Sequence, residues 1–147
     1  PMIAYERMAF DHADNKYRFP EAIHGEEGPT PEFPLRLLTL IRRDAIHSQI
    51  SSKKQMRLPT VWIAPDSPAL KDVDLGEDVY LVSPLARLRV EVKALPGLHG
   101  EAVIYRRGDW IKHGGGVNRL VDAVLTDVGD GASFYSQCVR VENQFYF

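Results

Sequence analysis

The strongest constraint on the fold is an alternation of apolar and charged residues over residues 86–94. Leu88, Val90 and Val92 fall on one side of an extended chain, and charged side chains fall on the other. This pattern predicts a strand with one face in a core and one face in water. Further short apolar runs bounded by turn-forming residues also predict strands, at residues 35–41, 60–64, 79–83, 102–106 and 137–142.

Short strands that outnumber short helices predict a mainly β protein built as a compact closed barrel, because an open sheet of this size leaves unpaired edges. The run LRLLTLI at residues 35–41 is almost continuously apolar and predicts a strand buried on both faces. Two short helices are also expected. One would be capped by Asp66 or Ser67, and the other would cover residues 117–124, where apolar residues recur at helical spacing.

Composition argues against several classes of function for this chain. The formal net charge of −2 argues against the broad basic surface that nucleic-acid binding requires. A single cysteine, Cys138, excludes an internal disulfide and a thiolate cluster, and the histidines lack metal-binding spacing, so no protein-built metal site is expected. No apolar stretch is long enough to span a bilayer, so we expect no membrane contact and a cytoplasmic location, or a periplasmic one if the full-length protein carries an export signal.

The chain divides into two parts by pattern. Residues 1–32 show little periodicity and end in a segment rich in Gly, Pro and Glu, so we expect an N-terminal arm or linker from a preceding domain. Residues 33–147 hold all the strand signals and are expected to form the barrel domain. The start at Pro1 leads us to expect a piece of a longer polypeptide.

Three sequence blocks occur in a fixed order. The first is FPLRLLT at residues 33–39, followed by Arg42, His47, Ser48 and Gln49. The second is VWIAPD at residues 61–66, followed by Gly76 and residues 79–83. The third and most specific is GGGVNRL at residues 114–120, followed by Asp130-Gly131, Tyr135 and VRVE at residues 139–142. Together they resemble the molybdopterin-dinucleotide-binding domain at the C-terminus of the dimethyl-sulfoxide-reductase superfamily, which includes formate dehydrogenases and nitrate reductases.

This resemblance implies a six-stranded, closed double-psi β-barrel over residues 33–147. It implies that loops of the barrel approach a molybdopterin guanine dinucleotide that carries molybdenum or tungsten. In that family the protein ligand of the metal and most substrate contacts come from earlier domains. The chain is therefore expected to be a cofactor-binding part of an oxidoreductase that is not catalytic alone, with the N-terminal catalytic domains as its partners.

The chemistry of these residues suits such a ligand. The Asn118 side chain offers an acceptor and a donor, the complement of a pterin edge. Arg42 or Arg119 could contact a diphosphate, and the glycine triplet lets backbone amides approach an anion. The resemblance and this chemistry give the following candidate cofactor-binding residues: Thr39, Arg42, His47, Ser48, Gln49, Asp66, Gly115, Gly116, Asn118, Arg119, Tyr135 and Gln137.

Other interpretations stay open. His47 can equally be a structural histidine instead of a cofactor-binding residue. Asp66 can be a helix cap instead of a contact with the guanine. The chain could be a complete small subunit of a multi-subunit enzyme similar to formylmethanofuran dehydrogenase. It could also be a double-psi barrel adaptor unrelated to molybdenum.

Overall fold

A closed barrel dominates the structure. The computed structural model describes residues 6–7, 10–23, 25–46, 49–55, 57–126 and 129–143. The strands are β1 (Leu35–Leu40), β2 (Thr60–Ile63), β3 (Val79–Val82), β4 (Arg87–Ala94), β5 (Ala102–Arg106) and β6 (Cys138–Asn143). The helical elements are α1 (Ser52–Gln55) and three 3-10 turns, η2 (Pro68–Leu70), η3 (Ile111–His113) and η4 (Val117–Arg119).

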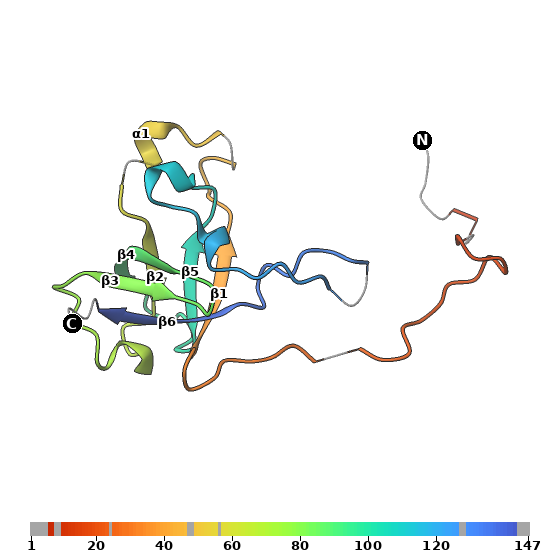
Figure 1. Cartoon of the computed structure of the whole chain (residues 1–147), viewed down its shortest axis with the longest axis horizontal. Coiled ribbons are helices and arrows are strands. Elements are labelled where there is room, and N and C mark those ends of the chain that lie inside the picture. Colours follow the sequence, from red (N-terminus) through yellow and green to blue (C-terminus); the bar gives the residue numbers. More distant parts are fainter. Residues whose placement is uncertain are drawn as a thin grey trace.

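The strand order confirms the predicted fold class. Around the closed barrel the strands run β1-β5-β2-β4-β3-β6. Two pairs, β1·β5 and β2·β4, are parallel, and the other neighbours are antiparallel. Because β1 and β5 are parallel, their carboxyl ends point to the same end of the barrel, where residues 107–119 lie (Figure 1).

The core fills the inside of this barrel. In β4 the inward Leu88 and Val90 are buried while Arg87 and Arg89 are exposed, which confirms the strand predicted from the alternation. The buried side chains of the other strands pack into the same cluster. Burying them removes apolar surface from water, the main stabilising term for such a fold.

The prediction that the first strand is buried on both faces is wrong. Burial in β1 alternates, with Leu35, Leu37 and Thr39 buried and the residues between them only partly covered. The outer face carries Arg36, Leu38 and Leu40, and the Arg36 guanidinium donates to the Glu27 carbonyl at 3.1 Å. The strand with consecutive buried residues is instead β5, from Ala102 to Tyr105.

The helix predicted over residues 117–124 is also wrong in extent. Only the single turn η4 forms, although Leu120 does reach the core. The Asp122 carboxylate accepts the Ala123 amide at 2.7 Å, and the Gln137 side chain accepts the Asp122 amide at 3.1 Å. These side chains satisfy the amides that a longer helix would use, so the chain leaves the barrel in an extended turn instead.

The capping prediction holds for Ser67 and not for Asp66. The Ser67 hydroxyl accepts the Ala69 amide at 3.4 Å and donates to the Gly100 carbonyl, while Asp66 is exposed. The turn η2 lies at the end of the barrel away from residues 111–119 (Figure 1).

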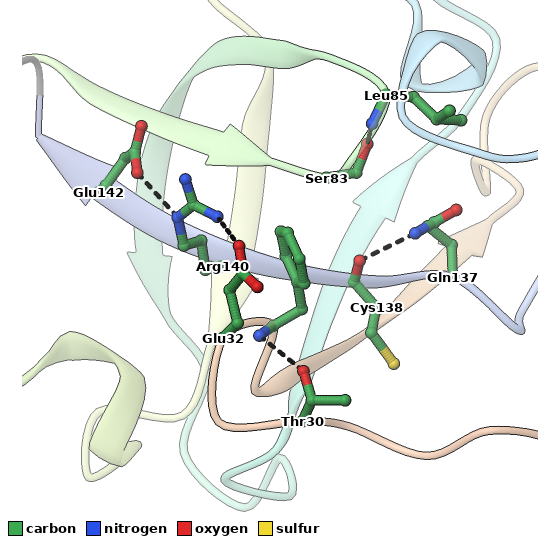
Figure 2. A network of polar contacts seen from close by, with 9 residues as sticks. Thr30, Glu32, Ser83, Leu85, Gln137, Cys138, Arg140 and Glu142 are labelled. Carbon is green, nitrogen blue, oxygen red and sulfur yellow. Dashed lines mark hydrogen bonds and ion pairs between the residues drawn. The ribbon is translucent and has the colours of Figure 1, made fainter.

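The N-terminal arm is tied to the barrel through β6. The Arg140 Nε atom lies 2.8 Å from a Glu142 carboxylate oxygen, and its Nη1 atom lies 3.5 Å from a Glu32 oxygen (Figure 2). The Arg140 guanidinium also lies 5.1 Å from the ring centroid of Phe33. Among the described residues before β1, no helix or strand forms.

Candidate functional site

A pocket of about 550 Å³ opens at the end of the barrel where β1 and β5 finish. We call it the glycine-loop pocket, because it adjoins the glycine loop at residues 114–116. Its walls come from the end of β1, the loop after β5, the turn η4 and the segment before β6. The lining residues are Thr39, Arg107, Gly108, Asp109, Trp110, Gly116, Val117, Asn118, Val121 and Phe134.

Glycine is required in the wall of this pocket. Gly116 has φ of +103°, a conformation that residues with a β-carbon rarely adopt, and a Cβ there would lie 2.7 Å from the Ile111 Cγ1 atom. A Cβ at Gly115 would lie 2.3 Å from the Asp109 Cβ atom. Both distances are shorter than real Cβ atoms show. The backbone of the glycine loop can therefore pack against Ile111 and Asp109 only because residues 115 and 116 have no side chain.

Three polar side chains meet at the pocket wall, where Asp109 lines the pocket and Arg42 and Tyr105 contact it. The Asp109 carboxylate accepts from the Arg42 guanidinium and from the Tyr105 hydroxyl, the latter at 2.9 Å. Burial, followed by the charge of Asp109, raises the pKa of Tyr105, which keeps its hydroxyl protonated and able to donate. Arg42 and Asp109 thus neutralise each other.

Arg107 supplies the uncompensated charge of the pocket. Within the part of the chain that the structure describes, Arg107 forms no ion pair, and its buried Nε atom has no hydrogen-bond partner. Its guanidinium lies 5.2 Å from the ring centroid of Phe134. Since the charge of Asp109 is balanced by Arg42, the pocket is suited to an anion.

An aromatic group stands at the pocket rim. The Trp110 and His113 rings stack with centroids 5.8 Å apart, and the Lys112 ammonium lies 4.3 Å from the Trp110 ring centroid. The Trp110 amide donates to the buried Gln55 side chain at 2.7 Å, which connects α1 to this loop.

Several residues predicted from the sequence meet at this pocket. Thr39 from the first sequence block lines it together with Gly116 and Asn118 from the third. Gly115 packs directly behind it against Asp109, and Arg42 reaches it only through the same carboxylate. The Asn118 side chain is exposed and makes no hydrogen bond to another described residue.

The other candidates lie elsewhere or are not described. His47 and Ser48 fall outside the described residues. Gln49 and Arg119 are exposed and do not line the pocket. Asp66 belongs to the turn before η2, at the other end of the barrel.

Gln137 lines a second, larger pocket, and Tyr135 belongs to the same segment before β6 but does not line that pocket. The Tyr135 side chain is exposed, and its carbonyl accepts from Arg36 at 3.2 Å. This groove has a volume of about 710 Å³ and lies between the arm and two segments, residues 121–126 and 133–137. Val121 borders both pockets, so the two hollows are neighbours on the surface.

Sequence reasoning missed the loop after β5. Arg107, Asp109 and Trp110 follow a predicted strand directly and precede the glycine triplet, a position at which polar and aromatic residues line sites. Phe134 carried no such signal. Its place in the wall depends on the Leu125↔Ala132 bridge, which pairs the segment after η4 with the segment before β6.

No group of three or more His, Cys, Asp or Glu side chains among the described residues is placed to hold a metal ion. The same residues include no helix with the length and apolar character needed to cross a membrane.

The comparisons with known proteins match this chain to part of two larger proteins. No family model matches the chain. The probable oxidoreductase YyaE of Bacillus subtilis (strain 168) is 25% identical over 123 residues, which make up 83% of this chain and 18% of that protein. In fold the chain is similar to acetylene hydratase from Pelobacter acetylenicus, with a TM-score of 0.58 and 15% sequence identity over 77% of this chain and 19% of the hydratase.

The chain therefore spans about a fifth of the length of each of these proteins. The sequence match relates it to an oxidoreductase, and the structural match shows a shared fold.

Proposed function

We propose that this chain is the cofactor-cradling domain of a molybdenum or tungsten oxidoreductase and holds part of a molybdopterin guanine dinucleotide. One observation carries the proposal. Thr39 from the first sequence block and Gly116 and Asn118 from the third line a single pocket, although they are far apart in the sequence. The match to an oxidoreductase supports it.

The donors around the pocket fit this ligand. A diphosphate needs cationic or N–H partners, and Arg107 has a buried Nε atom without a partner among the described residues. A pterin edge needs both a donor and an acceptor, which the free Asn118 amide supplies. Glycine at positions 115 and 116 lets the loop pack against Asp109 and Ile111, where a Cβ would collide, and this packing places Gly116 in the pocket wall.

Each residue then has a distinct role. Asn118 would orient the ring edge, and Arg107 would hold an anionic oxygen. The Thr39 hydroxyl, which now donates to the Phe134 carbonyl at 3.4 Å, would keep that wall in place. The metal of the cofactor would supply the redox chemistry, with its protein ligand on another domain, so this domain alone is not catalytic.

The partners in this proposal are the catalytic domains of the same oxidoreductase. The size of the relatives supports this, since the matched part is 18% of YyaE. The remaining contacts to the dinucleotide would come from those domains, so the isolated chain should bind weakly. Nanomolar binding would need about −12 kcal/mol from this fragment alone.

Calorimetric titration with molybdopterin guanine dinucleotide under anaerobic conditions tests the proposal. Arg107→Gln should weaken binding by roughly 10-fold or more, since a charge-assisted hydrogen bond contributes about 1.5–3 kcal/mol. Asn118→Ala should weaken it by a smaller factor. The matched control is Arg87→Gln on β4, where the guanidinium lies over the Tyr80 ring at 4.0 Å and not in the pocket.

Two results would count against the proposal. If the wild-type chain shows no binding at millimolar dinucleotide, an adaptor barrel becomes the better interpretation. If Arg87→Gln weakens binding as much as Arg107→Gln does, the ligand binds elsewhere.

A further inference from the structure

The Asp109 carboxylate joins the segment after β1 to strand β5. Its Oδ1 atom accepts from Arg42, which follows β1, and its Oδ2 atom accepts from the Tyr105 hydroxyl on β5 at 2.9 Å. The Asp109 side chain is 10% exposed and that of Arg42 is 23% exposed. A carboxylate this buried requires partners for both oxygens, and here it has them.

The arginine depends on this carboxylate in turn. The Arg42 Nη2 atom bonds Asp109, while its buried Nε atom has no partner among the described residues. Arg42 is thus held by Asp109, although the sequence had suggested a contact with diphosphate. The sequence singled out Arg42 without indicating which anion it meets.

The Asp109 side chain also packs closely against the glycine loop. The Gly115 backbone passes so close that an added Cβ would lie 2.3 Å from the Asp109 Cβ atom and 3.2 Å from its Cγ atom. Gly116 follows at once and lines the pocket. The position of the Asp109 side chain therefore sets how far the loop can move toward the barrel.

We propose that Asp109 is a positioning residue that fixes the glycine loop in the pocket wall, and that Arg42 acts through it. The consequence for the dinucleotide rests on the proposed function above, but the positioning does not. Asp109 holds the pocket wall in its binding shape before any ligand arrives, so its loss loosens the loop with or without ligand.

Hydrogen exchange of the full chain tests this without a ligand. The reporting amides belong to Gly114, Arg119 and Leu120, which donate to the carbonyls of Ile111, Gly116 and Val117 at 2.9–3.0 Å. Asp109→Asn keeps the shape and removes the charge. We expect these amides to exchange about tenfold faster in this variant, the effect of losing one charge-assisted hydrogen bond from a local opening equilibrium.

Asp78→Asn is the matched control. Asp78 also pairs with an arginine, Arg89, but on the exposed surface of β3 and β4. Exchange in the loop should stay at the wild-type rate in this control, and exchange in β2 and β4 should be unchanged in both variants. If Asp109→Asn unfolds the chain, Arg42→Gln weakens one of the two hydrogen bonds to Asp109 and should give roughly a fivefold increase in the exchange rate of the same amides.

A steric test changes the glycine side of the contact between Gly115 and Asp109. Gly115→Ala should accelerate exchange of the same amides because its Cβ would meet Asp109, whereas Gly100→Ala, whose Cβ would make ordinary contacts at 3.7 Å and beyond, should not. Combining Gly115→Ala with Asp109→Gly removes the steric collision. This double variant also lacks the carboxylate that bonds Arg42 and Tyr105. The double variant should thus remain loosened.

The outcomes separate the two claims. Unchanged loop exchange in Asp109→Asn, or an equal rise across all strands, overturns the positioning role. Faster loop exchange together with no dinucleotide binding by the wild-type chain supports the positioning role and overturns the proposed ligand. Faster loop exchange together with at least tenfold weaker dinucleotide binding supports both.

Discussion

The loss of stability in Gly116→Ala measures how closely the glycine loop packs in the pocket wall. An alanine there has two separate costs. The backbone φ of +103° is unfavourable for a residue with a β-carbon by about 1–2 kcal/mol, and the new Cβ lies 2.7 Å from the Ile111 Cγ1 atom. Relieving such an overlap costs about 1–3 kcal/mol in a packed region. Gly116→Ala should therefore lower the free energy of unfolding by about 2–5 kcal/mol, unless the loop opens locally first.

Two glycines provide matched controls for the backbone cost. Gly114 has φ of +82° and Gly97 has φ of +83°, and a Cβ at either would meet nothing within 4 Å. Alanine at these positions should cost only the conformational part, about 1–2 kcal/mol. Urea denaturation of the three variants gives the difference, which isolates the contact with Ile111.

The collision between a Cβ at residue 116 and Ile111 can also be removed by shortening the Ile111 side chain. Ile111 is 63% exposed, so Ile111→Ala alone should change stability by less than about 0.5 kcal/mol. Combined with Gly116→Ala it should recover about 1–3 kcal/mol, because the colliding atom is gone. Equal costs for Gly116→Ala and Gly114→Ala, or no recovery in the double variant, would refute the described packing of the glycine loop.

Three further predictions concern the barrel itself. Leu37→Ala should destabilise the chain by about 2–5 kcal/mol in urea denaturation because the side chain is fully buried, whereas the exposed Leu85→Ala should cost less than about 0.5 kcal/mol. The pKa of Tyr105 is raised above its ordinary value of 10.0, so only the unfolded chain releases this proton just above that pH. The wild-type stability should thus fall there more steeply than that of Tyr105→Phe, and parallel pH profiles would contradict this. Burial raises the pKa of the Cys138 thiol, so iodoacetamide should label the folded chain more slowly than the urea-unfolded chain at mildly alkaline pH, and equal rates would argue against it.

Local pattern predicted most of the strands because their residues face a core on one side. The alternation around Leu88 and Val90 gives β4, and the run at residues 102–106 gives β5 with the bounds observed. Burial on the second face was harder to predict. It depends on what covers the outside of each strand, as the polar contacts of Arg36 illustrate.

Some of the candidate residues that line the glycine-loop pocket were singled out from the sequence by a signal other than periodicity. Resemblance to a known family singled out Thr39, Gly116 and Asn118, which periodicity alone could not have connected. It could not give the partner of Arg42, because the choice between a ligand and Asp109 is made by tertiary contacts. The buried glutamine Gln55 also escaped notice, since its role comes from a long-range bond to the Trp110 amide.

An NMR titration of the ¹⁵N-labelled chain with molybdopterin guanine dinucleotide tests the central claim most directly. The account predicts that the largest amide shifts fall on Gly116, Val117 and Asn118 in the pocket wall, with small shifts in β3 and β4. Shifts concentrated on the far side of the barrel around Ser67 and Gly100, or an unchanged spectrum at millimolar dinucleotide, would contradict it.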